Sequence, residues 1–416
     1  MDVAAKRRAT RFVLLTVFTY SAGFGIIMPV LPELIVELEG ISLSEATLLG
    51  GFVAASYAVF QFLMGPLVGN LGDRYGRRPV FLLSLMGFAI DFVVMGFAQN
   101  IIWLFVGRSI AGALGAIFGP ANAAMADMSS DVDRARGFGL VSAAFGVGFV
   151  IGPAVGGLLG GYGTRLPFFV AGGMAFVTFV YGFFVFEETM PEENKRRFSL
   201  KRANPLGALL SLKKIPSVLG IAVVYLLWIT CSNVYPVSWA YFAPIQFGWD
   251  SRMVGISLTL VGISMAFAQT YLLSHLVSKF GERKAAFLAI SVGLVGLMLF
   301  GFVRSGTFAL FMCLFIGIQA MAMPCINALM SRRTPKDMQG ELQGFNGSMA
   351  ALSSLIAPLV YNTTLSFYTR ESASVYFPGA AFMLAAILGV CAFIALLLVK
   401  PVAASSQANP TQSTGG

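Results

Sequence analysis

Residues 69–78 read Gly-Asn-Leu-Gly-Asp-Arg-Tyr-Gly-Arg-Arg and stand between two long apolar stretches. A related decapeptide, Ser-His-Leu-Val-Ser-Lys-Phe-Gly-Glu-Arg, occupies residues 274–283, about half the chain further on. A leucine, a basic residue, an aromatic residue, a glycine and an arginine hold the same places in both. A polar loop that returns at this distance predicts two equivalent halves, the plan of membrane proteins built from parallel repeats.

The sequence on either side of the two loops is that of a membrane protein. Of 416 residues, 57% are hydrophobic and 11% are charged, whereas soluble domains average about 25% charged residues. This composition excludes a soluble enzyme, a nucleic-acid reader and a disordered scaffold. A bilayer core of about 30 Å needs ~20 apolar helical residues. The spans that we predict lie at about 12–36, 46–70, 80–98, 101–122, 138–160, 166–186, 217–241, 252–277, 285–304, 307–330, 340–365 and 375–399.

These spans predict an all-α integral membrane protein with twelve transmembrane helices in two six-helix, pseudo-symmetric halves. We expect an N-terminal half at 1–186, a cytoplasmic central loop at 187–214 and a C-terminal half at 215–400. The polar residues 401–416 are expected to form a disordered cytoplasmic tail.

The basic residues indicate the orientation. The net charge is +9, and most lysines and arginines fall on one side of the membrane when the N-terminus is placed inside. Cytoplasmic loops are enriched in these residues, so both termini are predicted to be cytoplasmic. The positive charge is then a topology signal, and we expect no nucleic-acid partner.

Cysteine and histidine give no sign of a chemical centre. Cys231, Cys313, Cys325 and Cys391 all lie in apolar runs, and His275 is the single histidine. Without a CxxC motif or a Cys/His cluster, the sequence predicts no metal site, no cofactor and no enzyme.

The loop at 69–78 combines glycines with a charge cluster. Glycine permits tight turns and close helix approach. A carboxylate beside several arginines can form a network that joins two lobes in one state and breaks in another. The alternative is a set of positive-inside anchors. The residues of this predicted gate are Gly69, Asp73, Arg74, Gly76, Arg77 and Arg78.

The fifth span is rich in glycine. Positions 148, 152 and 156 lie four apart on one helix face, where small residues let two helices touch closely. A proline in this span is expected to kink the helix. We predict a closely packed, flexible helix at a rocking interface, with static packing as the alternative. Its residues are Gly139, Gly148, Gly152, Pro153, Gly156 and Gly157.

Two charged residues fall inside spans, where charge is costly and usually functional. At 1.5 Å per residue, Asp91 is about 18 Å from the inner edge and Arg108 is about 10 Å from the outer edge. In a core of about 30 Å these depths are similar, so the two side chains can pair. We predict a buried, protonation-sensitive pair, with a static ion pair as the alternative. Glu33, near the outer end of the first span, is expected to be solvated.

Polar and aromatic side chains within spans usually face the bundle interior. The candidates for a substrate cavity are Tyr20, Trp228, Asn233, Gln269, Gln319 and Asn346. We expect about half of a wider set, which also includes Ser21, Tyr235, Ser264, Asn327 and Gln343, to contact a substrate. Others are expected to belong to lipid-interface belts or to helix contacts.

Together these motifs resemble the major facilitator superfamily and, more closely, its twelve-helix drug:proton antiporters of the tetracycline-resistance type. The resemblance also rests on segments 25–32, 84–91, 247–258 and 339–344. It implies proton-coupled efflux of a small amphiphilic, drug-like compound by alternating access, in a protein of the bacterial inner membrane. The implied partners are a small-molecule substrate, protons and membrane lipid, and the chain is expected to be a monomer. Asp73 and Arg77 would belong to the gate, and Asp91 and Arg108 to coupling or to structure within the N-terminal half.

Three positions depart from the tetracycline exporters. Tyr20, Met265 and Gly293 stand where those proteins have an acidic residue, a histidine and an acidic residue. The resemblance therefore does not identify the substrate. The alternative to export of a drug-like compound is export of one endogenous metabolite or siderophore. A non-transporting membrane sensor or structural protein is the alternative from another class, although 187–214 is too short for a signalling domain.

Overall fold

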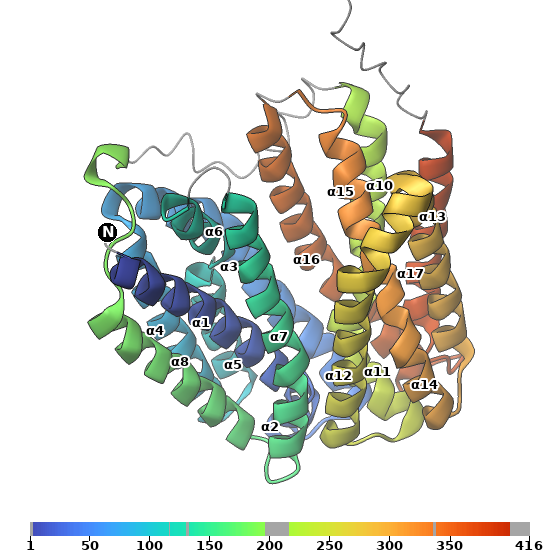
Figure 1. Ribbon diagram of the computed structural model, residues 1–416. Coiled ribbons are helices and arrows are strands. Elements are labelled where there is room, and N and C mark those ends of the chain that lie inside the picture. Colours follow the sequence, from blue (N-terminus) through green and yellow to red (C-terminus); the bar gives the residue numbers. More distant parts are fainter. Residues whose placement is uncertain (1–2, 116, 130–132, 196–215, 336–337, 400–416) are drawn as a thin grey trace, which may run out of the picture.

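The computed structural model describes residues 3–115, 117–129, 133–195, 216–335 and 338–399, and these ranges contain helices and connecting turns but no strand (Figure 1). In the N-terminal half the helices are α1 (Val3–Ile27), α2 (Leu31–Glu39), α3 (Leu43–Tyr75), α4 (Arg77–Gly96), α5 (Ile101–Leu114), α6 (Phe118–Asp127), α7 (Arg134–Gly160) and α8 (Leu166–Val185). In the C-terminal half they are α10 (Pro216–Ser232), α11 (Val234–Phe247), α12 (Ser251–Phe267), α13 (Leu273–Phe302), α14 (Gly306–Ile316), α15 (Ala322–Ser331), α16 (Gln339–Thr369) and α17 (Ala380–Leu398). Most of the predicted central loop and the whole predicted tail lie outside the described residues.

Among the described residues, 11 helical stretches are long and apolar enough to cross a membrane. One of them, Ser251–Phe302, has 52 residues, which at about 1.5 Å per residue is more than two bilayer crossings. The stretch breaks at Gly281, whose φ of 77° and ψ of 162° are not helical. Counted as two, it brings the crossings to the predicted twelve.

Several crossings are interrupted by a break or by a turn that is not α-helical. The first ends at Ile27, and α2 then starts with a proline in its first turn. The eighth contains a π-helical turn, Ala268–Leu272, and the tenth contains a 3₁₀ turn, Gly317–Met321. Such turns change the direction of side chains within a span and often mark functional positions.

Each half has its own buried apolar core. Residues between Ala9 and Phe186 form one cluster, which includes the fully buried rings of Phe12, Phe81 and Phe168. The second cluster is built almost wholly from residues between Val218 and Leu396. The two halves therefore pack largely independently.

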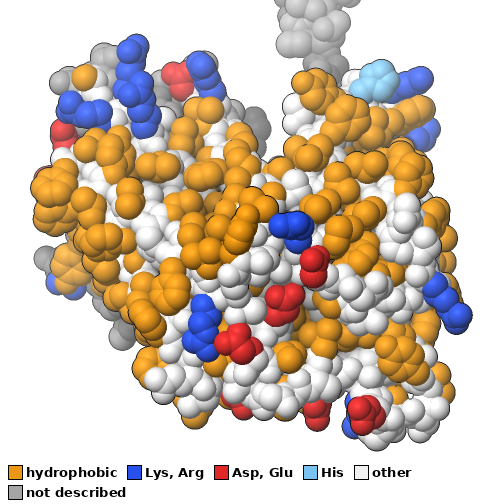
Figure 2. All heavy atoms as spheres, turned by 90° about the horizontal axis from the view of Figure 1, so that it is seen from below, with side chains coloured by type: hydrophobic (Ala, Val, Ile, Leu, Met, Phe, Trp, Pro, Cys, Tyr) orange, Lys and Arg blue, Asp and Glu red, His pale blue; other side chains and the backbone are white. Residues whose placement is uncertain are grey.

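The halves touch at one end and separate at the other. We call the end that carries α2 the lower end and the end that carries the Gly76 turn the upper end, as drawn in Figure 1. Near the lower end, α3 packs on α16 and α7 packs on α12. The Ser44 hydroxyl there donates to the Thr369 hydroxyl across 2.7 Å. Seen from below, apolar side chains cover much of the surface, and basic and acidic side chains lie beside one another near its middle (Figure 2).

Candidate functional site

Asp91 on α4 and Arg108 on α5 form an ion pair inside the N-terminal half. Nε of Arg108 donates to Oδ1 of Asp91 across 3.3 Å, and Nη2 of Arg108 pairs with Oδ2. Gly107 makes room for the pair, since a Cβ at this position would stand 2.7 Å from Oδ1 of Asp91. The structure thus brings together the two charged residues that depth arguments placed at one level.

A chain of hydroxyl and amide groups lies beside this pair. Tyr20 and Tyr57 share a hydrogen bond, and Nε2 of Gln61 donates to the Tyr57 hydroxyl across 2.9 Å. The guanidinium of Arg108 stands 5.8 Å from the centre of the Tyr57 ring. Sequence reasoning missed Tyr57 and Gln61, although their spacing of one helical turn on a mostly apolar span could have revealed a polar stripe.

The predicted gate forms a charge network at the upper end. Arg77 is mostly buried, and its Nη1 donates to Oδ1 of Asp73 across 2.9 Å. Its Nε donates to Oδ2 of Asp127 on α6 across 3.3 Å. One guanidinium therefore links the end of α3 to the end of α6, and Asp127 is a member of the network that the sequence did not suggest.

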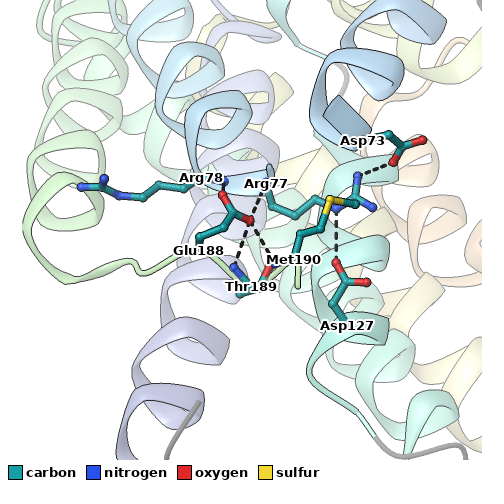
Figure 3. Close-up of polar contacts among 7 residues, drawn as sticks. All are labelled: Asp73, Arg77, Arg78, Asp127, Glu188, Thr189 and Met190. Carbon is teal, nitrogen blue, oxygen red and sulfur yellow. Dashed lines mark hydrogen bonds and ion pairs between the residues drawn. The ribbon is translucent and has the colours of Figure 1, made fainter. Parts of the chain in front are cut away.

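Glu188, also missed, holds the N-terminus of α4 (Figure 3). Its carboxylate accepts hydrogen bonds from the backbone N–H groups of Arg77 at 2.7 Å and of Arg78, Thr189 and Met190 at 3.0 Å each. A carboxylate at this place satisfies unpaired N–H groups and the positive end of the helix dipole. The segment after α8 is thereby fastened to the gate.

Three gate residues lie differently from the prediction. Gly69 is not in a turn, because α3 stays helical to Tyr75 and the break comes at Gly76, with φ of 100°. Arg74 is exposed and stands over the Tyr75 ring. Arg78 donates to the Phe183 carbonyl oxygen across 2.7 Å, and within the described ranges its side chain joins no carboxylate.

The glycines of α7 face two different partners. Cβ atoms at Gly148 and Gly152 would stand 2.7 Å and 2.6 Å from carbonyl oxygens of α1, and one at Gly156 would collide with Ile26. Gly157 instead faces α12, where a Cβ would stand 2.6 Å from the Ser251 oxygen. Gly139 faces open space, so it does not take part in either contact.

The same helix carries Pro153, and α7 continues through this residue. A Cβ at Gly25 of α1 would stand 2.7 Å from Cδ of Pro153. The Val150 carbonyl oxygen accepts a hydrogen bond from the Thr259 hydroxyl of α12 across 3.4 Å. The helix therefore lies between its own half and the other one, with close packing on both sides.

A cavity of about 430 Å³ lies in the C-terminal half. Its aromatic lining includes Trp228, Tyr235 and Trp239, and none of the described side chains that line it is charged. Gln269 from the π-helical turn and Gln319 from the 3₁₀ turn both line it. Three predicted cavity residues, Trp228, Gln269 and Gln319, therefore meet at one place.

A second cavity of about 190 Å³ lies between the halves. Arg108, Tyr57 and Gln61 line it from one side and Asn233 from the other. The Asn233 amide also donates to the Ser353 hydroxyl across 2.7 Å. The ion pair is therefore connected to the interface between halves through Arg108, while Asp91 lines neither of these cavities.

Two predicted cavity residues lie elsewhere. Tyr20 packs against the rings of Phe88 and Phe118, at 4.7 Å and 5.8 Å between ring centres. Asn346 is buried and donates to Oδ1 of Asn327 across 3.0 Å. Both side chains are used in packing within one half, and neither lines the two cavities described above.

The largest of these cavities, about 740 Å³, separates the halves towards the upper end. Gln61, Gly69 and Arg77 line it from the N-terminal half, and Gly344 and Ser354 from the other. Gln61 and Ser354 also line the 190 Å³ cavity. The two spaces between the halves therefore share lining residues.

Two of the three positions that depart from tetracycline exporters, Met265 and Gly293, lie at the 430 Å³ cavity. Met265 lines it. A Cβ at Gly293 would stand 2.6 Å from the Trp228 ring and 2.9 Å from Oε1 of Gln319. An acidic side chain at this position would thus compete with the present lining, which is uncharged.

Glu33 is not simply solvated. Its Oε1 accepts a hydrogen bond from the Ser251 N–H, across 3.1 Å and across the two halves. Desolvation by partial burial raises the pKa of Glu33 from its ordinary value, this hydrogen bond opposes the rise, and Asp250 adds to it. Glu33 therefore joins α2 to the start of α12 at the lower end.

No group of three or more His, Cys, Asp or Glu side chains that could hold a metal ion occurs in the described part of the chain. The arrangement instead offers a buried ion pair, an aromatic cavity and two contact surfaces between halves.

Comparison with known proteins supplies the family. A family model described as Major Facilitator Superfamily matches residues 13–358. Tetracycline resistance protein, class C, of Escherichia coli is 35% identical over 84% of this chain and 87% of its own. Multidrug resistance protein 2 of Bacillus subtilis (strain 168) is 27% identical over 86% of this chain and 89% of its own.

A solved structure has the same fold. It is a bacterial homolog to the human lysosomal transporter Spinster, in an inward-facing and unoccupied conformation, with a TM-score of 0.78 and 17% identity. The match covers 96% of this chain and 98% of that one. The predicted fold, an all-α membrane protein with two six-helix halves, is the fold of that transporter.

Proposed function

Because the chain belongs to the major facilitator superfamily of membrane transporters, we propose that it is a secondary active exporter that exchanges a small amphiphilic, drug-like compound for protons. The observation that carries this proposal is the Asp91–Arg108 pair beside a cavity between the halves. Similarity to tetracycline and multidrug resistance proteins supports the direction of transport.

The proposed orientation places the upper end and both termini in the cytoplasm and the protein in the bacterial inner membrane. The basic residues at the upper end, including Arg74 and Arg78, favour this arrangement. The halves then meet at the periplasmic side and enclose the 740 Å³ cavity towards the cytoplasm. The conformation is accordingly inward-facing.

We propose that residues 1–186 and 215–400 move as two lobes of a monomer. The contacts between lobes at the lower end use glycines and single hydrogen bonds, such as those at Gly157 and Ser44. Contacts of this kind can form and break without exposing a large apolar core. The Arg77 network would form part of the gate that closes when the upper ends approach.

Asp91 is the proposed proton acceptor. Its charge is held by Arg108, and protonation would release the guanidinium, which lines the space between the lobes. A ligand in that space could then interact with Arg108. Proton binding and ligand binding would be coupled because both compete for one guanidinium.

The 430 Å³ cavity is the proposed substrate site. Its described lining combines aromatic rings with the amides of Gln269 and Gln319 and carries no charge. Such a site favours an uncharged compound with aromatic surface, since a buried unpaired charge is costly. A metal-chelated, charged substrate of the kind implied for tetracycline exporters has no partner at Met265 or Gly293.

The test is transport into inverted membrane vesicles with a panel of compounds, with and without a pH gradient. Gradient-dependent uptake of uncharged aromatic compounds, lost in Asp91→Asn, is expected. Uptake that ignores the gradient refutes proton coupling and leaves export standing. Absence of flux for every compound would favour a dedicated metabolite exporter or a non-transporting protein, and comparison with siderophore-type substrates separates the two.

A further inference from the structure

A fourth cavity, with a polar lining, lies at the upper end of the C-terminal half, away from the proposed transport path. It measures about 300 Å³ and is enclosed by the ends of α10, α15 and α17 and by the break at Gly281 within α13. Its only described acidic side chain is that of Glu282. The cationic side chains that line it are those of Arg283, Lys284, Arg332 and Arg333.

The acidic side chain does not balance these charges. Glu282 pairs with Arg332. Arg283 donates to the carbonyl oxygens of Leu396 and Leu397, at 3.1 Å and 3.3 Å. Partial burial and the nearby charge of Arg283 lower the pKa of Arg333. Even with Arg333 left out of the count, Arg283 and Lys284 add to the Glu282–Arg332 pair, so the described lining carries an excess of positive charge that an anion would stabilise.

The repeat shows what occupies the equivalent place in the other half. Gly76 and Gly281 adopt the same unusual backbone, with φ of 100° and 77° and ψ of 170° and 162°. At Gly76 the space is filled by the carboxylate of Glu188, which would collide with a Cβ there. The N-terminal half thus supplies its own anion to the helix that follows the turn.

The C-terminal half does not repeat this arrangement. No described atom lies within 4 Å of a Cβ built on Gly281. Residues 399–416, which follow the last helix as Glu188 follows α8, contain no aspartate or glutamate. Where the first half has the Glu188 carboxylate over the turn, the second half has an open turn, and the carboxylate of Glu282 beside it is paired with Arg332.

We propose that this basic cavity binds the phosphate group of an anionic membrane phospholipid. The apolar surroundings favour a lipid over a free phosphate ion. Phe280 lines the cavity and is 47% exposed, and Leu397 and Leu398, which stand in sequence between the lining residues Leu396 and Val399, are 55% and 78% exposed. A headgroup phosphate at this level would leave acyl chains against these side chains. Basic pockets between helices on the cytoplasmic side of membrane proteins bind anionic headgroups. The proposal rests on the orientation given above, and not on the substrate or on proton coupling.

Two lysines provide a matched test. Lys284 lines the cavity, whereas Lys279, five positions earlier, is also exposed and does not line it. The full-length protein would be purified as wild type, Lys284→Gln, Lys284→Glu, Lys279→Gln and Lys279→Glu. Retained phosphatidylglycerol and phosphatidylcholine would be counted by native mass spectrometry, and inorganic phosphate would be added as a competitor.

We expect the wild type to retain phosphatidylglycerol in preference to phosphatidylcholine. Removing one cation should weaken the preference about fivefold in Lys284→Gln and more in Lys284→Glu, with little change in the Lys279 variants. If the Lys279 and Lys284 variants lost the preference for phosphatidylglycerol equally, the effect would come from general surface charge. That result would overturn the proposed site. An unchanged preference in Lys284→Glu would also overturn it. Displacement by inorganic phosphate alone would assign the site to a free anion and refute the lipid.

Discussion

Asp91 and Arg108 form an ion pair whose side chains are 0% and 4% exposed. Removing one partner of such a pair leaves an uncompensated buried charge, which costs about 3–5 kcal/mol. The pair therefore contributes to stability as well as to the proposed coupling, and the two contributions can be separated.

We expect Asp91→Asn to lower the thermal unfolding temperature and to abolish gradient-driven transport. The double variant Asp91→Asn/Arg108→Gln should recover much of the stability, because no buried charge remains, but should still fail to respond to the gradient. Unfolding would be followed in detergent and transport in inverted vesicles. Gradient-driven transport in a stable Asp91→Asn protein would refute the coupling role.

Neighbouring glycines of α7 should behave differently. Gly157→Ala is expected to weaken the contact with α12 and to shift the protein by about tenfold or more towards a state with the lower ends apart. Spin labels on the lower ends of the two halves would report this shift, after Cys391, the exposed one of the four cysteines, is replaced.

Gly156→Ala and Gly139→Ala are the controls for that substitution. Gly156 faces α1 within its own half, so the alanine should destabilise the fold by about 1–3 kcal/mol without favouring either state. At Gly139, which faces open space, the alanine should be neutral or slightly stabilising. Equal shifts in all three variants would contradict the assignment of Gly157 to the contact between halves.

Glu188→Gln should loosen the start of α4. The loss of a charged acceptor at the helix N-terminus is expected to cost up to about 2 kcal/mol. Glu187→Gln is the matched control, since Glu187 is 59% exposed and its ion pair in the described part of the chain is with the exposed Arg8, an interaction worth little. Thermal unfolding of the two variants would be compared, and equal effects would argue against the cap.

The raised pKa of Glu33 predicts that closure of the lower end depends on the external pH. Because its pKa is raised when the lower ends touch, that state binds the proton more tightly than a state in which Glu33 is solvated. The closed lower end should be favoured fully below the ordinary value of 4.5 and lose this advantage as the pH rises through the raised pKa. Glu33→Gln should remove this pH dependence of the label distance, and an unchanged pH dependence would refute it.

Much of this arrangement follows from sequence alone. Helix rise and span boundaries placed Asp91 and Arg108 at one depth, because a straight helix converts position directly into distance. The spacing of Gly148, Gly152 and Gly156 gave a common face. The spacing does not indicate which helix packs against this face, because the sequence of one span does not specify its neighbour.

Other features could not be predicted. Glu188 lies in an irregular segment without periodicity, so its capping of α4 depends on the folding of residues far along the chain. Residue type predicts a turn at Gly69, but α3 continues through Gly69 to Tyr75, because tertiary packing can override the low helix propensity of glycine. The sequence predicts a solvated Glu33. Its hydrogen-bond partner, Ser251, comes from the other half, so the sequence around Glu33 does not indicate this contact.

The 740 Å³ cavity between the halves has a pharmacological consequence. Its lining joins the end of the gate at Arg77 to small residues of α16 such as Gly344, and these surfaces must approach one another if the upper ends close. A compound bound in this cavity would prevent the upper ends from closing and would therefore block the transport cycle. Because it would not compete with the substrate, the block would be the same for any transported molecule. Inhibitors aimed at this space should therefore act independently of substrate identity.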